Sequence, residues 1–166
     1  SMYKPSEYCI SNVDGTAKLF ESLIKNKDIK KNIKKIIVAS SKTIYGEGAY
    51  RCKEHGMIFP PLRTIDQLNK KDFELHCPGC SKVMQSAPIP EEKPPNCLSV
   101  YAITKYATEN LAMIFGQTLN IPTVAFRYFS VFGPRQSLSN PYTGVCSIFL
   151  SRMVNNQQPV IFEDGN

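Results

Sequence analysis

The stretch Ile36-Ile-Val-Ala-Ser-Ser-Lys-Thr-Ile-Tyr-Gly46 is the clearest indication of fold class in this 166-residue chain. An apolar run that ends in hydroxyl residues and a glycine turn is typical of a buried strand in a parallel sheet. A second such run, Thr123–Phe132, follows a helical pattern that begins after Ser99, a residue suited to capping a helix. Because strand, crossover, helix and strand follow in this order, the sequence predicts an α/β protein with a parallel sheet.

Three further elements are expected from the spacing of apolar residues. Residues 8–25 and residues 144–156 are predicted helices with an apolar face, and Val160–Phe162 is a predicted short strand. Cys9 and Cys146 fall within the two helical patterns, so both are expected in the core.

The predicted helix after Ser99 carries Tyr101 and Lys105, four residues apart. This spacing places both side chains on one face, where the ammonium can favour the phenolate. A tyrosine ordinarily ionises at about pH 10, so it needs such a neighbour to act as a base at neutral pH. The pair is therefore a candidate for proton transfer, although the same spacing also occurs on ordinary helix surfaces.

Residues 47–98 are rich in Pro, Lys and Cys and contain two knuckles, Cys52-Lys-Glu-His55 and Cys77-Pro-Gly-Cys80. Four Cys and His ligands in two knuckles satisfy tetrahedral zinc, and no coordination position remains open for water. The segment therefore predicts a structural zinc ion that orders a long loop. A redox pair within the second knuckle and a disulfide framework are the weaker alternatives.

The net charge of +6 comes mostly from a lysine-rich run at residues 25–35. That run has no interleaved aromatic residues, which argues against a nucleic-acid surface. The sequence shows neither an apolar leader nor an apolar run of about 18 residues, so no membrane contact is expected. Six cysteines, three of them predicted metal ligands, suit a reducing cytoplasm.

Five motifs, in order along the chain, resemble the extended short-chain dehydrogenase/reductase family, and within it the NAD-dependent nucleotide-sugar epimerases and dehydratases. They are Asn12-Val-Asp-Gly-Thr16, Ser40-Ser41 before Ile44-Tyr-Gly46, Tyr101-x-x-x-Lys105, Arg127-Tyr-Phe129 and Gly133-Pro-Arg135. The resemblance implies a Rossmann-like parallel sheet with flanking helices. It also implies that residues 1–46 and 99–166 belong to a catalytic domain into which residues 47–98 are inserted.

The resemblance also implies roles for individual residues. Tyr101 would remove a proton from a sugar hydroxyl, Ser41 would hydrogen-bond the same oxygen, and Lys105 would hold the nicotinamide ribose. The implied NAD contacts are Tyr101, Lys105, Ala39, Ser40, Tyr128 and Phe129, and the implied substrate contacts are Ser41, Ser130, Arg135 and Asn140. An epimerase of this family oxidises the sugar transiently and returns the hydride to its other face, so NAD is regenerated. For Arg127, Tyr128 and Phe129, packing at a strand end is as good an interpretation as direct contact with a ligand.

The sequence departs from the family pattern at three points, and the first of them restricts the possible reactions. Lys42 and Thr43 stand where the 4,6-dehydratases carry an acidic pair, so dehydration is disfavoured and epimerisation at C4 or simple oxidation remains. Ser130 stands where the family often has an asparagine. No glycine-rich dinucleotide motif occurs, so the chain is interpreted as the central piece of a longer protein and expected to be inactive alone.

A narrower resemblance points to the dTDP-L-rhamnose 4-epimerase-like sub-group, whose members carry a Cys/His insertion. It rests on Arg51-Cys-x-x-His-Gly56, Arg63, Gln67-Leu68, Cys77-Pro-x-Cys80 and Gln136–Gly144. The implied substrate is a dTDP- or UDP-hexose, and the implied assembly is a homodimer formed through a four-helix bundle. A dehydratase or reductase of the same family and a non-catalytic, zinc-stabilised binding module stay open as alternatives.

Overall fold

The computed structural model describes residues 3–136 and 144–163. The predicted combination of a parallel sheet with flanking helices is confirmed. The chain divides into two units, Ser1–Gly48 with Ile89–Phe129 and Ala49–Pro88 with Ser130–Asn166.

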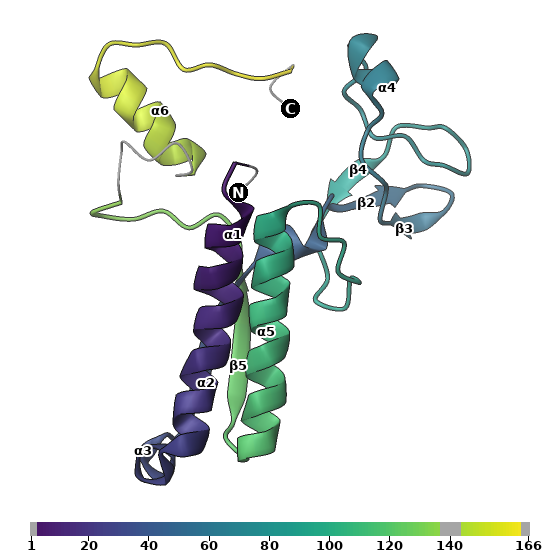
Figure 1. Cartoon of the computed structure of the whole chain (residues 1–166). Coiled ribbons are helices and arrows are strands. Elements are labelled where there is room, and N and C mark those ends of the chain that lie inside the picture. Colours follow the sequence, from purple (N-terminus) through teal and green to yellow (C-terminus); the bar gives the residue numbers. More distant parts are fainter. Residues whose placement is uncertain (1–2, 137–143, 164–166) are drawn as a thin grey trace. The chain divides into compact units, whose positions relative to one another are not determined.

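The first unit is a pair of parallel strands with helices packed on one face (Figure 1). β1 (Ile36–Ser41) pairs with β5 (Thr123–Tyr128), with Ile36 opposite Thr123 and Ser41 opposite Tyr128. α2 (Gly15–Lys25) and α5 (Val100–Leu119) lie side by side, and α5 packs against both strands. The remaining elements of this unit are α1 (Pro5–Tyr8), the π-helical turn η1 (Cys9–Asp14), α3 (Lys27–Asn32) and the 3-10 turn η2 (Lys42–Tyr45).

Local chemistry explains the bounds of α5. The Ser99 hydroxyl accepts a hydrogen bond from the Ala102 amide at 3.1 Å, as expected of an N-cap. The helix ends at Asn120, whose left-handed backbone has a φ of 54°. Near that end Gly116 allows a close approach to β5, because a Cβ at this position would collide with the Thr123 side chain.

The core of the first unit lies between the helices and the sheet. Its buried members are Phe20, Leu23, Ala112, Leu119 and Ile121. Phe20 and Leu23 confirm that the predicted helix over residues 8–25 faces the core. The expected burial of Cys9 is wrong, since its side chain is exposed. Cys9 lies in the π-helical turn, where the wider helical repeat breaks the 3.6-residue pattern used to place it.

The second unit contains a small antiparallel sheet, in the order β3-β2-β4. Its elements are β2 (Ala49–Cys52), β3 (Gly56–Ile58), β4 (Gln85–Ala87), α4 (Ile65–Asn69) and α6 (Val145–Val154). Ala49 pairs with Ala87, so the segment between them starts and ends at neighbouring points.

α6 confirms the helix predicted over residues 144–156, but two related predictions are wrong. Cys146 is exposed on α6 rather than buried. Val160–Phe162 does not form a strand, because none of the strands in the described ranges pairs with it. No helix within those ranges is long and apolar enough to cross a membrane.

Candidate functional site

The carboxyl end of β1 carries the hydroxyl residues that the sequence singled out. Ser40 and Ser41 are both buried there. The Ser41 hydroxyl accepts hydrogen bonds from the amide and the hydroxyl of Thr43, at 3.3 and 3.0 Å. η2 follows directly, and the Ile44 carbonyl accepts a hydrogen bond from the Asn96 amide at 2.8 Å. The segment leading into α5 is therefore docked on the turn that follows Ser41.

Tyr101 and Lys105 lie on successive turns at the start of α5, and both are half-buried. The Tyr101 ring meets the Tyr8 ring edge-on, with centroids 6.1 Å apart. Burial lowers the pKa of Lys105.

Asn12, from the first of the five motifs, anchors the same part of α5. Its side-chain amide donates to the Thr104 hydroxyl at 3.0 Å, and its carbonyl accepts from the Thr108 hydroxyl at 2.9 Å. These contacts tie η1 to the helical turns that carry Tyr101 and Lys105.

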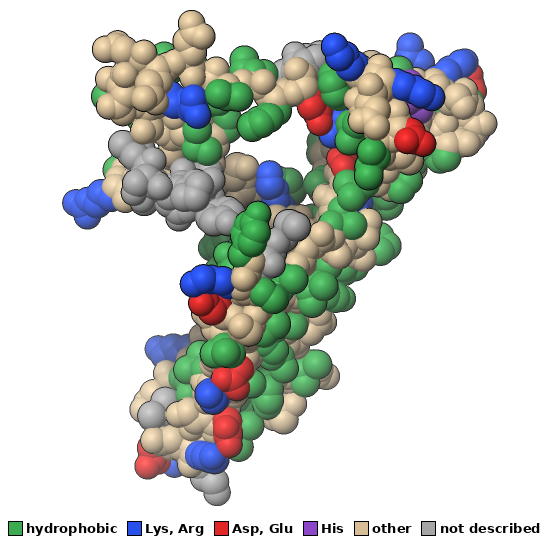
Figure 2. All heavy atoms as spheres, turned by 45° about the horizontal axis from the view of Figure 1, so that its top comes forward, with side chains coloured by type: hydrophobic (Ala, Val, Ile, Leu, Met, Phe, Trp, Pro, Cys, Tyr) green, Lys and Arg blue, Asp and Glu red, His purple; other side chains and the backbone are tan. Residues whose placement is uncertain are grey.

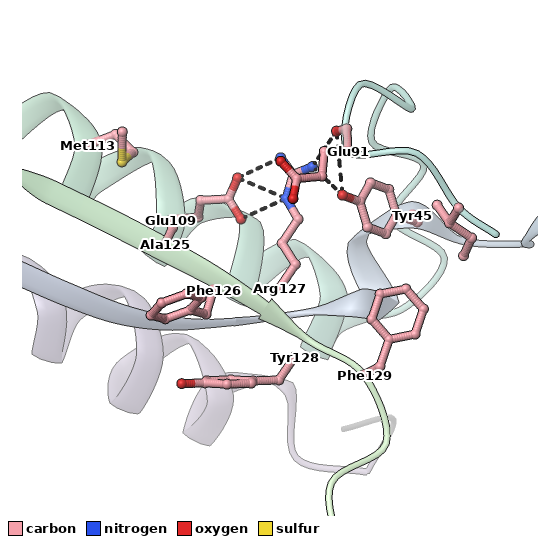
Figure 3. A pocket seen from close by; sticks show the side chains of 10 residues that line it. Tyr45, Glu91, Glu109, Met113, Ala125, Phe126, Arg127, Tyr128 and Phe129 are labelled. Atoms are coloured by element: carbon pink, nitrogen blue, oxygen red, sulfur yellow. Dashed lines mark hydrogen bonds and ion pairs between the residues drawn. The ribbon is translucent and has the colours of Figure 1, made fainter.

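Arg127 lies at the centre of a polar cluster in the first unit (Figure 3). Its Nη2 donates to Glu109 Oε1 at 2.7 Å, and its Nε lies 3.2 Å from both carboxylate oxygens. Its Nη1 donates to the Tyr45 hydroxyl at 2.8 Å and to the Glu91 carbonyl at 3.1 Å. Burial alone would raise the pKa of Glu109, but the hydrogen bonds from Arg127 hold that pKa below its usual range. The sequence left packing at a strand end and a direct ligand role open for Arg127. In the structure its partners are polar groups of the same unit.

Sequence reasoning missed Glu109. The available signal was its spacing, since Tyr101, Lys105 and Glu109 follow one another at intervals of four residues on one helix.

A pocket of about 630 Å³ lies beside this cluster. Its lining residues are Tyr45, Ile89, Glu91, Glu109, Met113, Ala125, Phe126, Arg127, Tyr128 and Phe129. Ser41, Tyr101 and Lys105 do not line it. The pocket is therefore distinct from the predicted site of proton transfer.

The remaining residues proposed from the sequence fall in three places. Ala39 and Ser40 lie on β1 opposite Phe126 and Arg127 of β5. Tyr128 ends β5 and Phe129 comes directly after it, and the two are about half exposed, at 48% and 52%. Lys42 Nζ lies 5.8 Å from the centre of the Phe129 ring. Ser130 and Arg135 belong to the second unit and are exposed, whereas Asn140 lies outside the described residues.

The second unit brings together all four predicted metal ligands. The ligand atoms of Cys52, His55, Cys77 and Cys80 lie within 4.8 Å of one another. His55 Nδ1 is 3.5 Å from Cys52 Sγ and 3.4 Å from Cys77 Sγ, and the Sγ atoms of Cys52 and Cys80 are 3.6 Å apart. The hydrogen bond with His55 lowers the pKa of the Cys52 thiol to about 6.

These separations fit a tetrahedral zinc site. Zn–S bonds of about 2.3 Å and Zn–N bonds of about 2.05 Å place two sulfurs about 3.8 Å apart and a sulfur and a nitrogen about 3.6 Å apart. Gly79 makes the arrangement possible, because a Cβ there would lie 2.8 Å from His55 Nε2. No pair among these four cysteine and histidine side chains is joined by a disulfide.

Comparison with known proteins gives the family. A model of the "NAD dependent epimerase/dehydratase family" matches residues 1–166. The chain belongs to this family. A dTDP-L-rhamnose 4-epimerase from Burkholderia thailandensis is 30% identical to this member over 167 residues, which cover all of this chain and 44% of the relative.

Solved structures of several epimerases resemble this chain. A UDP-N-acetylglucosamine 4-epimerase from Methanobrevibacter ruminantium, in complex with UDP-N-acetylmuramic acid, is 30% identical with a TM-score of 0.66, over 98% of this chain and 39% of that one. A UDP-glucuronic acid 4-epimerase from Bacillus cereus, in complex with UDP-glucuronic acid and NAD, is 25% identical with a TM-score of 0.59, over 96% and 36% of the two chains. The chain thus spans less than half the length of the relatives that it matches.

Proposed function

We propose that residues 1–166 supply the catalytic centre of an NAD-dependent epimerase that inverts C4 of a nucleotide-diphosphate sugar. One observation supports this most: α5 carries Tyr101 and Lys105 on successive turns and packs against both β1 and the turn that follows Ser41. The family match and the resemblance to 4-epimerases favour the same activity.

Each residue then has a defined chemical role. Tyr101, as the phenolate, takes the proton of the C4 hydroxyl, and Ser41 donates a hydrogen bond to the same oxygen. Lys105 favours the phenolate and binds the nicotinamide ribose. Bound NAD would supply the reversible hydride chemistry at C4, and Tyr101, Ser41 and Lys105 would orient the sugar and move its hydroxyl proton.

The residues fit NAD at its nicotinamide end only. Ala39, Ser40, Tyr128 and Phe129 stand at the carboxyl ends of two paired strands, where α/β sheets bind dinucleotides. The chain contains no glycine-rich turn for the pyrophosphate. We therefore assign the pyrophosphate site to another part of the full-length protein.

For the substrate we propose a dTDP- or UDP-hexose, with Ser130, Arg135 and Asn140 as its contacts beyond Ser41. The relatives named above act on, or are bound to, sugars carried by these nucleotides. The cationic side chain of Arg135 suits a diphosphate.

We further propose that Cys52, His55, Cys77 and Cys80 bind a structural zinc ion. All four donors come from the protein, so the ion has no open position at which to activate water. It would order residues 47–98, which we infer to be an insertion into a catalytic domain formed by residues 1–46 and 99–166.

We also propose a homodimer in which α2 and α5 pair with the same helices of a second copy. Figure 2 shows hydrophobic side chains gathered along these two helices. Leu19 of α2 and Ile103 and Ile114 of α5 are 60%, 56% and 60% exposed. Apolar surface of this kind on paired helices favours burial against another helix pair. A predicted metal site that uses three of the six cysteines favours a reducing, cytoplasmic location.

The activity is tested by incubating the full-length protein with a panel of UDP- and dTDP-hexoses and following the anomeric NMR signals. A C4 epimer should appear with at least one sugar. A product that has lost one molecule of water from the sugar would favour a dehydratase instead. Absence of turnover across the panel, with NAD and sugar nucleotide bound, would favour a binding module.

A further inference from the structure

Three segments must hold their relative positions for the proposed chemistry: the end of β1, the turn η2 and the first turns of α5. Ser41 belongs to the first, η2 fixes its hydroxyl through Thr43, and α5 carries Tyr101 and Lys105. We propose that Arg127 is the positioning residue that holds these segments together. This inference rests on the proposed function.

The first contact that carries the proposal joins Arg127 to α5. The guanidinium meets the Glu109 carboxylate through both Nε and Nη2, the planar two-point geometry that fixes orientation as well as distance. Glu109 follows Lys105 by one helical turn, and its side chain is only 10% exposed. The ion pair therefore fixes the rotation and height of the helix close to the proposed catalytic pair.

The second contact joins Arg127 to η2. Its Nη1 donates to the Tyr45 hydroxyl, and the guanidinium carbon lies 4.9 Å from the centre of the Tyr45 ring. Tyr45 is the last residue of the turn that begins immediately after Ser41. Its backbone carbonyl also accepts from the buried Lys93 ammonium. The turn is thus held from both its side chain and its backbone.

The third contact joins Arg127 to the segment that leads into α5. Nη1 also donates to the Glu91 carbonyl at 3.1 Å, and the Tyr45 hydroxyl lies 3.4 Å from the same oxygen. Arg127 itself lies opposite Ser40 in the parallel register. The Arg127 side chain thus contacts α5, η2 and the segment that leads into α5, and its backbone is paired with the end of β1. Together these segments set the distance between Ser41 and Tyr101.

Geometry of this kind governs turnover more than affinity, because Arg127 is not among the residues assigned to substrate or NAD. Displacing a reacting group by about 1 Å can reduce a rate by about 100-fold. A lysine would keep the charge but lose the planar two-point contact and the ring contact. Arg127→Lys should therefore restore only part of what Arg127→Met loses.

The test compares Arg127→Met, Arg127→Lys, Tyr45→Phe and Tyr45→Phe combined with Arg127→Met in the full-length protein. Arg127→Met should lower kcat by about 100-fold, with KM for the sugar nucleotide close to wild type and NAD still bound. Tyr45→Phe should lower kcat less, and should add nothing in the Arg127→Met background, since both changes break the same network.

A matched control separates positioning from stability. Leu23→Ala removes a buried core side chain of the first unit and should lower Tm without a comparable loss of kcat. If Leu23→Ala loses kcat as Arg127→Met does, or if Arg127→Met keeps wild-type kcat, the inference is wrong.

Amide hydrogen exchange of the same variants gives a readout that does not need turnover. Arg127→Met should speed exchange in residues 42–45 and 100–105 while β1 and β5 stay protected. If exchange is unchanged there, or rises evenly through the unit, Arg127 does not hold these segments. If the wild type epimerises no sugar, the proposed activity fails, and this exchange pattern still decides whether Arg127 holds the segments in place.

Discussion

At the scale of single residues, the predicted site depends on side chains that lie on successive turns of one helix. Tyr101 and Lys105 share one face of α5 because they are four residues apart, and Glu109 continues the series towards Arg127. The hydroxyl of Ser41 is oriented by the backbone and side chain of Thr43. The charge and orientation of the groups at the predicted reaction site therefore depend on residues that are close to them in the sequence.

The ion pair of Glu109 predicts a pH-dependent contribution to stability. Arg127 holds the pKa of Glu109 below its ordinary value of about 4.3, so the ionised carboxylate stabilises the fold. Because the folded-state pKa is depressed, this stabilisation is complete above about pH 4.3 and is lost as the pH falls through the lowered pKa.

Glu109→Gln should therefore be less stable than wild type by about 1–2 kcal/mol at pH 7. The difference should shrink as the pH falls below about 4, as measured by denaturant unfolding at each pH. A difference that stays constant from pH 7 to pH 3 would show that ionisation of Glu109 contributes nothing.

At the scale of elements, the close approach of α5 to β5 determines how the helix packs on the sheet. Gly116 permits that approach, since a Cβ there would overlap the Thr123 side chain. Gly116→Ala should destabilise the full-length protein by about 1–3 kcal/mol, through overpacking, as measured by thermal unfolding.

Gly15→Ala is the matched control for that substitution. Gly15 lies at the start of α2, where an added Cβ would meet its nearest atom, the Ile10 carbonyl oxygen, at 3.5 Å, an ordinary contact. Alanine favours helices over glycine, so this variant should be as stable as wild type or more so. Equal losses for the two glycines would contradict the close approach.

The small sheet of the second unit should depend on metal. Removing zinc with a chelator should unfold β2, β3 and β4, because the core of this unit is built from Cys52, Leu75, Cys77 and Met84. Purified full-length protein should contain about one zinc per chain by elemental analysis, and Cys77→Ser should lose it.

Cys97→Ser provides the control, since Cys97 lies in the other unit and should not affect zinc content. Gly79→Ala should weaken zinc binding by displacing the His55 ring. Protein that folds and retains the β2–β4 pairing after complete chelation would exclude a structural metal.

Elements that depend on local pattern were predictable from the sequence, and those that depend on distant partners were not. β1, α5 with its Ser99 cap, and the cluster of four Cys and His side chains follow from apolar runs, capping residues and ligand spacing. The pairing of Glu109 with Arg127 crosses from helix to strand, and no local period encodes it. The strand predicted at Val160–Phe162 does not form for the same reason, because strand-forming residues make a strand only where a partner strand is available.

At the scale of the whole molecule, apolar surface marks where further chain is expected. Ile37, Val124 and Phe126 stand on the sheet face away from α5 and are exposed. Parallel sheets are covered on both faces, so the full-length protein should bury this surface. This agrees with a chain that spans less than half the length of its relatives.

The proposed dimer predicts a second whole-molecule result. Ile114→Glu in the full-length protein should place a charge in the helical interface and yield monomers in sedimentation experiments. Val83→Glu, at a residue that is 55% exposed in the second unit, should leave the assembly unchanged. A wild-type monomer, or an Ile114→Glu protein that stays dimeric, would exclude this interface.

The most direct test of the catalytic centre follows a deuterium atom placed at C4 of the sugar that the full-length protein turns over. If Tyr101 takes the hydroxyl proton while the C4 hydride is stored and returned, the C4 epimer should keep its deuterium. Tyr101→Phe should bind NAD and lose turnover by about 1,000-fold. Deuterium lost to water during epimerisation, or Tyr101→Phe turning over at the wild-type rate, would contradict the proposed mechanism.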